Sequence, residues 1–109
     1  MIKKTLLTEL ATVIRSKNAG PFKITLDIFF KNEENYLEVK GSGVITKETI
    51  AKLYNLPENR ILGIYFVDKV HGIKITILRG PSSGSASDTD VYGAQQHAPL
   101  LVLEIPLTN

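Results

Sequence analysis

The sequence predicts an α+β fold, with a single antiparallel or mixed sheet of about five strands and two helices packed on one face. Residues 22–30 alternate apolar and polar side chains, which is the period of a strand with one buried and one solvent-exposed face. Two segments with helix-capping residues follow, at 32–43 and 46–57. More strand patterns come after them. This order of elements is typical of two helices that face one antiparallel sheet.

The segment from Phe22 to Phe30 carries the clearest strand pattern. Its even positions are all apolar, with polar side chains between most of them. Among these polar residues, Asp27 is expected to pair with Lys74 or Lys23 across the sheet. Phe29 and Phe30 follow one another, which puts one aromatic ring on each face of the sheet. If the outer face carries Phe29, a partner should cover it.

Four other segments bear on the strand count. Residues 73–77 alternate in the same way, and residues 101–107 do so with a less polar outer face. Residues 61–67 form a nearly continuous apolar run, which predicts a central strand. The segment 68–72 predicts a hairpin turn between that strand and the next. Residues 6–14 fit both a helical face and a strand, so periodicity alone leaves them open.

Capping residues define the two predicted helices. Asn32 predicts the start of the first helix, which the glycines at 41 and 43 end. Thr46 predicts the start of the second, and Ile45 and Ile50 are spaced as a hydrophobic staple around it. Asn55 and Pro57 close this second helix.

Composition narrows the class of protein. The 109 residues suit one domain, predicted as a single α+β domain over residues 1–109 with a long loop at 80–99. No cysteine is present, which excludes disulfides and thiolate metal sites and favours a cytoplasmic protein. No apolar run is long enough to span a membrane, and no export signal is expected. The net charge is +2 with scattered lysines, so no nucleic-acid partner is predicted.

The run Arg15-Ser16-Lys17-Asn18-Ala19-Gly20 is a candidate anion-binding site. An arginine can grip a carboxylate or phosphate with two hydrogen bonds, and a lysine adds a point charge. Backbone N–H groups near the glycine could add a small anion nest. The same run also fits an ordinary polar turn between two strands. The candidate ligand-binding residues are Arg15, Ser16, Lys17, Asn18 and Gly20, together with Gln96.

The second half of the 80–99 loop holds the candidate catalytic residues Asp88, Asp90, Tyr92 and His97. His97 could act as a general base paired with an aspartate, and Tyr92 as an acid. No metal site is predicted, because the aspartate spacing matches no established calcium loop, and no cofactor is expected. If the last strand runs beside the first, this loop and the 15–20 segment could meet in one polar cleft.

Two resemblances extend this reading. The runs 15–22 and 88–100 resemble signature runs of a bacterial family catalogued as domain of unknown function 4387. More distantly, the order of features is similar to the ferredoxin-fold domain attached to proteins of the acyclic terpene utilisation A type. The loop that begins at Arg15-Ser16 matches that domain's Arg-Ser loop, but Asn18-Ala19-Gly20 replaces its Asp-Lys-Gly, so the likeness does not imply a shared ligand. This likeness implies a ferredoxin-like sheet and a strand at 6–14.

The resemblances also imply a role. Members of the first family look like free-standing small versions of the second domain. They imply a companion subunit or interaction module of a larger catabolic protein that acts on carboxylic acids or acyl thioesters. The expected partner is therefore a larger protein subunit or another copy of the chain. The alternative is a small enzyme or ligand sensor that binds an anionic substrate in a cleft formed by the 15–20 and 88–97 loops.

Overall fold

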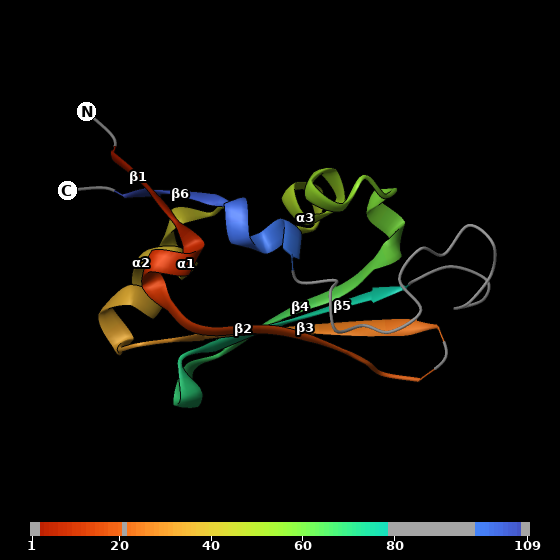
Figure 1. Cartoon of the computed structure of the whole chain (residues 1–109), viewed down its shortest axis with the longest axis horizontal. Helices are drawn as coiled ribbons and strands as arrows, with labels where there is room; N and C mark the ends of the chain where they lie inside the picture. Colours follow the sequence, from red (N-terminus) through yellow and green to blue (C-terminus); the bar gives the residue numbers. More distant parts are fainter. Residues whose placement is uncertain (1–2, 21, 79–97, 108–109) are drawn as a thin grey trace.

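Four antiparallel strands form the main sheet of the protein, in the order β2-β3-β5-β4 (Figure 1). The structure is a computed structural model that describes residues 3–20, 22–78 and 98–107. The bounds of the four strands are β2 Ala11–Asn18, β3 Lys23–Phe30, β4 Ile61–Val67 and β5 Gly72–Leu78.

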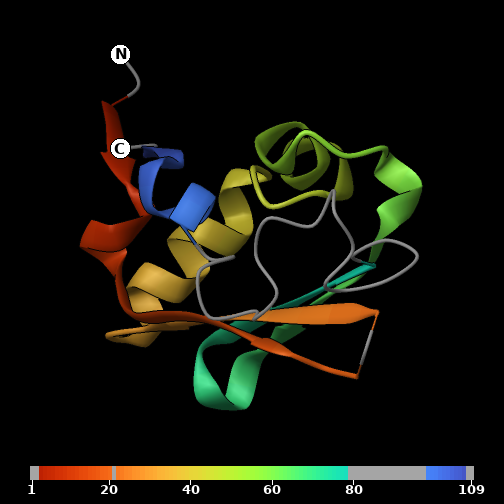
Figure 2. The same cartoon turned by 45° about the vertical axis from the view of Figure 1, so that its right-hand side comes forward.

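A second layer covers one side of this sheet. It contains the three α-helices of the described part of the chain and a small antiparallel sheet of two strands, β1 and β6 (Figures 1 and 2). Short 3-10 turns connect the larger elements. The bounds are β1 Lys3–Leu6, α1 Leu7–Leu10, α2 Glu33–Ser42, α3 Lys47–Tyr54, η1 Glu58–Arg60, η2 Asp68–Val70, η4 Ala98–Val102 and β6 Glu104–Leu107. The α+β class and the two main helices on one face are thus confirmed.

The core lies between the two layers. The even positions Ile24, Leu26, Ile28 and Phe30 of β3 are buried, as the alternation of the sequence predicts. Phe22 lies before the strand and is exposed. Side chains from β5, both main helices and β6 complete the cluster: Ile73, Ile75, Ile77, Tyr36, Val39, Ile50, Ala51 and Ile105.

Both main helices begin and end where the sequence predicts. The Asn32 side chain accepts a hydrogen bond from the Asn35 N–H at 2.8 Å, and Thr46 accepts one from the Thr49 N–H at 3.1 Å. Gly43, with φ 73°, ends α2 in the left-handed conformation that glycine adopts at least cost. The staple residues on either side of Thr46 are both buried.

The predicted arrangement of strands needs three corrections. The described residues form two sheets of four and two strands instead of one of about five. The ferredoxin-like topology is not confirmed, because in the chain both main helices lie between two β-hairpins. Residues 6–14 are not one strand: the short helix α1 separates β1 from β2. The last strand, β6, pairs with β1 and not with the main sheet.

The predicted place of the apolar run 61–67 is corrected as well. It forms β4, which is an edge strand of the main sheet and not a central one. Its inward side chains join the core, but Leu62, Tyr65 and Val67 are exposed apolar residues. The run is therefore more apolar than its place at the sheet edge requires. The predicted hairpin at 68–72 is confirmed, with η2 and a left-handed His71 between β4 and β5.

A polar contact joins α2 to this hairpin. The Tyr36 hydroxyl donates to Asp68 Oδ1 at 2.5 Å, and Lys40 Nζ lies 3.0 Å from the same oxygen. Burial of the ring, followed by the hydrogen bond to Asp68, raises the pKa of Tyr36 to about 12. The Tyr36 and Lys40 hydrogen bonds lower the pKa of Asp68. This contact therefore favours a neutral tyrosine beside an ionised aspartate.

The raised pKa of Tyr36 predicts a loss of stability at alkaline pH. In the unfolded chain the phenol ionises near its ordinary pKa of 10.0, and in the folded domain near 12. The stabilisation is complete below pH 10.0 and decreases as the pH rises to about 12. Tyr36→Phe should remove this part of the pH dependence, as measured by urea unfolding across that window. Tyr65→Phe, at an exposed ring, is the control, and an unchanged alkaline slope in Tyr36→Phe contradicts the assignment.

Candidate functional site

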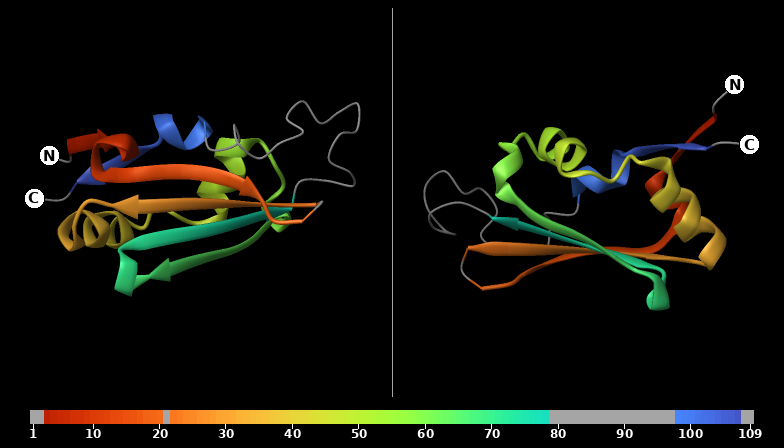
Figure 3. Two further views of the ribbon diagram at one scale, coloured as in Figure 1. Left: turned by 60° about the horizontal axis from the view of Figure 1, so that its bottom comes forward. Right: turned by 180° about the vertical axis from the view of Figure 1, so that it is seen from behind.

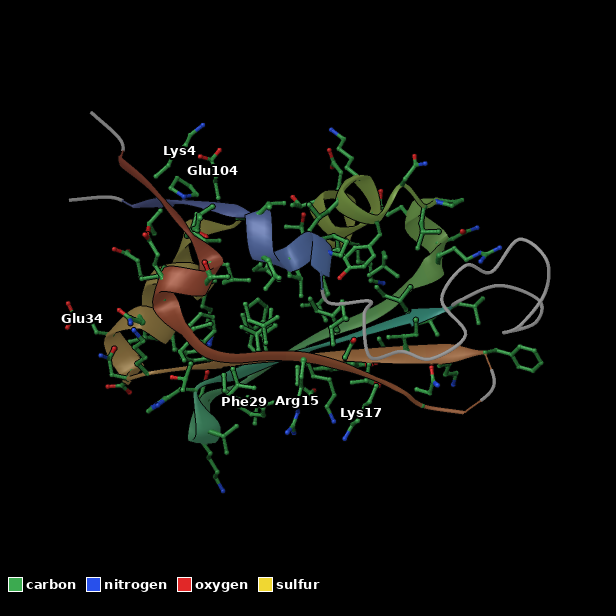
Figure 4. The ribbon with its side chains drawn as sticks, in the orientation of Figure 1. Lys4, Arg15, Lys17, Phe29, Glu34 and Glu104 are labelled. Carbon is green, nitrogen blue, oxygen red and sulfur yellow. The ribbon has the colours of Figure 1, made fainter. Side chains whose placement is uncertain are left out.

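The face of the main sheet that points away from the helices is the candidate site, and we call it the outer face. Figure 3 shows that no described helix lies on this side of the strands, apart from the η2 turn at the end of the hairpin. Figure 4 shows Arg15, Lys17 and Phe29 pointing away from the helical layer. Strand alternation and register define the residues of the outer face. They are Val13, Arg15, Lys17, Lys23, Thr25, Asp27, Phe29, Gly63, Tyr65, Val67, Gly72, Lys74, Thr76 and Leu78, with Val70 of η2 at one end.

Asp27 lies at the centre of the outer face and is only 5% exposed. Arg15 is directly opposite it on β2, with Nε 3.4 Å from Asp27 Oδ2. The Arg15 guanidinium also lies 5.4 Å from the centre of the Phe29 ring, within cation–π range. Because a buried carboxylate needs a compensating charge, the first role of Arg15 is to stabilise Asp27. The expected partners Lys74 and Lys23 form no ion pair with it, so that expectation was wrong.

Two glycines let aromatic rings lie close against the strands. A Cβ at Gly63 would overlap the ring of Tyr65, two residues further along β4. A Cβ at Gly72 would come within 3.0 Å of the Phe29 ring, which reaches across from β3. Glycine in a strand often marks such a close approach. The outer face therefore presents aromatic rings close to the strand backbone, on the same face as several cations.

A pocket of about 300 Å³ opens at one end of the outer face. Its walls are mostly apolar, and two charged residues, Asp27 and Lys74, lie beside them. Lys74 forms no ion pair with any residue in the described part of the chain. The lining residues are Asp27, Phe29, Val67, Val70, Gly72, Ile73 and Lys74.

The structure separates the residues of the predicted 15–20 site. Arg15 to Asn18 belong to β2 and not to a turn. Because side chains alternate along a strand, Arg15 and Lys17 lie on the outer face, whereas Ser16 and Asn18 point to the helical side. The turn comes later, where Gly20 has φ 92° and the Ala19 N–H donates to the Lys23 carbonyl at 2.8 Å. These residues therefore do not form one anion-binding loop.

The other half of the predicted cleft lies outside the described residues. Asp88, Asp90, Tyr92, Gln96 and His97 all fall in the range 79–97. The last strand does run beside the first, since β6 pairs with β1. However, the 15–20 segment lies at the opposite end of β2 from β1 (Figure 1). The cleft and its catalytic residues remain predictions. Among the described residues, no cluster of three His, Asp or Glu side chains could hold a metal ion.

Comparison with known families classifies the domain without naming a reaction. A family model described as "Domain of unknown function (DUF4387)" matches residues 7–104. The chain belongs to this family. No curated protein and no solved structure gives a significant match.

The DUF4387 match spans the chain from α1 to β6, so every residue of the outer face lies within it. The pocket and the Arg15–Asp27 pair are therefore parts of the family domain and not of an added segment. In the described ranges, no helix is long and apolar enough to cross a membrane.

Proposed function

We propose that this DUF4387 domain is a small companion subunit, an interaction module that binds a larger protein through its outer face. The observation that carries the proposal is the apolar character of that face. Tyr65 and Val70 are each 54% exposed, and Val13 and Val67 are also exposed on the same side. All three described α-helices cover the opposite side of the sheet (Figure 3). Contiguous exposed apolar surface of this kind marks interaction sites in soluble proteins.

The position of β4 supports the same proposal. Strands with apolar side chains on both faces are typical of sheets covered on both sides. In β4, Ile64 and Phe66 pack against the core, whereas Tyr65 and Val67 point outward without cover from a described element. A partner on the outer face would cover the outward apolar side chains of this strand.

The charge of the outer face indicates the chemistry of the partner. Arg15, Lys17, Lys23 and Lys74 project from it, and Asp27 is the acidic residue among them. A second copy docked face to face would bring like charges together, which disfavours association. A protein surface with an apolar centre and carboxylates around it would complement the face. We therefore assign the face to a larger, different protein with an acidic docking surface.

The resemblance to domains of the acyclic terpene utilisation A type indicates what kind of protein this partner is. It implies a larger catabolic protein that acts on carboxylic acids or acyl thioesters, and this stays a prediction by analogy. The alternative of a small enzyme or ligand sensor depends on the cleft between the 15–20 and 88–97 loops. No contact among the described residues favours that cleft, and Arg15 is already paired with Asp27.

The proposal predicts that a carboxylate placed on the outer face weakens partner binding. Val70→Glu introduces a carboxylate where acidic groups of the partner should lie. The full chain, tagged, is used to capture its partner from cells of its source at low salt, and the complex is weighed by native mass spectrometry. Wild type should retain one larger protein in a fixed ratio. The variant should bind that purified protein at least about tenfold more weakly.

Leu37→Glu is the matched control for this experiment. Leu37 lies on α2 and is 50% exposed, close to the 54% of Val70, but it belongs to the other side of the molecule. This variant should bind as wild type does. Recovery of the wild-type chain alone, or equal binding by both variants, overturns the proposal.

A further inference from the structure

The pocket at the end of the outer face has a shape and charge that define what it accepts. We infer that it is the anchor site for the partner protein, and that it receives a large apolar side chain with a carboxylate next to it. This inference rests on the proposed function. It goes further by naming the group that enters the pocket and the residue, Lys74, that selects it.

The apolar walls of the pocket favour an apolar side chain as the anchor. Phe29 from β3 and Val67 from β4 line it together with Val70 of the η2 turn. Its volume of about 300 Å³ is at the lower end of the range for small-ligand sites. One large side chain of a partner fits such a volume. In protein interfaces, side chains buried in pockets of this kind carry much of the binding energy.

The charged residues at the pocket determine which charge the anchoring group should carry. Asp27 is buried and already paired with Arg15. Lys74, directly opposite Asp27 on β5, has no ion-pair partner in the described part of the chain. The charge left to be neutralised at the pocket is therefore the Lys74 ammonium. A carboxylate beside the apolar anchor would neutralise it, whereas an amine would be repelled.

The surroundings of the pocket favour a protein as the source of this group. Two exposed apolar residues lie next to the pocket lining in register: Tyr65 is opposite Lys74, and Val13 is opposite Phe29. A free small acid would fill the pocket and leave these side chains uncovered. A protein surface would cover them together with the pocket, as interfaces with a central anchor and a surrounding rim do.

The test uses three small probes that share a phenyl ring and differ in charge: phenylacetate, phenethylamine and 2-phenylethanol. Each is titrated into the ¹⁵N-labelled full chain and followed by amide chemical shifts. Phenylacetate should produce saturable shifts at Val67, Val70, Gly72 and Lys74, and should bind about tenfold more tightly than phenethylamine. Lys74→Met should remove the preference for phenylacetate over 2-phenylethanol. Lys17→Met, outside the pocket, is the control and should keep the preference.

Several outcomes overturn this inference. If phenethylamine binds as tightly as phenylacetate, the pocket does not prefer a carboxylate and the role of Lys74 is contradicted. If none of the three probes shifts the amide signals of the pocket residues, the pocket does not bind an apolar group and the inference is wrong. Saturating phenylacetate should also reduce partner capture by the wild-type chain, and undiminished capture assigns the pocket to a free small acid and not to a protein anchor. Loss of capture in Val70→Glu alongside failed probes leaves the proposed function standing. Successful probes with no captured protein overturn both the proposed function and the protein anchor, and leave only the charge preference of the pocket.

Discussion

Replacing Ile28 by alanine is expected to lower the free energy of unfolding by about 3 kcal/mol. Ile28 is fully buried at the centre of the core. In register it lies between Ile14 of β2 and Ile73 of β5. Truncation therefore leaves a cavity that neighbouring strands cannot fill without breaking their pairing. Urea unfolding of wild type and variant at neutral pH measures the difference.

The control is an apolar residue that faces solvent. Leu62 of β4 is 41% exposed, so Leu62→Ala should change stability by less than about 0.5 kcal/mol. Such a small loss for Ile28→Ala as well would mean that β3 does not pack its even positions against the helices. The two-layer description of the fold would then be wrong.

The features that the sequence predicted well are local ones. Alternation over 22–30 identifies β3 and its buried face because the side-chain period of a strand requires no knowledge of its neighbours. Asn32 and Thr46 identify the helix starts for the same reason, since a cap bonds to a backbone N–H only three residues away.

The features that the sequence missed depend on contacts far apart in the chain. Whether β4 is central or at the edge depends on which strands pair with β5, and the apolar run at 61–67 is compatible with both. The pairing of β1 with β6 joins the two ends of the chain and leaves no local pattern beyond alternation. The short helix α1 fits the ambiguity of residues 6–14, which satisfied both periods.

The candidate site shows the same limit. The sequence suggests Arg15 as a free anion-binding group in a turn, whereas the structure places it on β2 beside Asp27. Its place opposite Asp27 follows from the β2–β3 register, which is set by the position of the turn after Asn18. The outer aromatic Phe29 was predicted from its neighbour Phe30, and the need to cover it was inferred from that alone. The pocket beside it requires β3, the β4–β5 hairpin and η2 together, so no single segment reveals it.

Arg15→Ala is expected to destabilise the domain by about 1–2 kcal/mol, because it leaves the buried Asp27 carboxylate without its cation. The figure is below that of a fully buried pair, since the Arg15 side chain is itself 56% exposed. Lys17→Ala is the matched control: Lys17 lies on the same strand and the same face, two residues further on. It should change stability by less than about 0.5 kcal/mol. Urea unfolding at neutral pH compares the three proteins.

A double-mutant cycle with Asp27→Asn separates the ion pair from the packing of Arg15 on Phe29. If the Arg15 guanidinium mainly compensates Asp27, Arg15→Ala should cost little once that carboxylate is an amide, with a coupling of about 1 kcal/mol or more. If the loss is the same in both backgrounds, the contact with the Phe29 ring accounts for it and the ion pair does not. If Arg15→Ala costs nothing in either background, Arg15 has no structural role, and the anion-binding function predicted for it from the sequence becomes the better explanation of its place on the outer face.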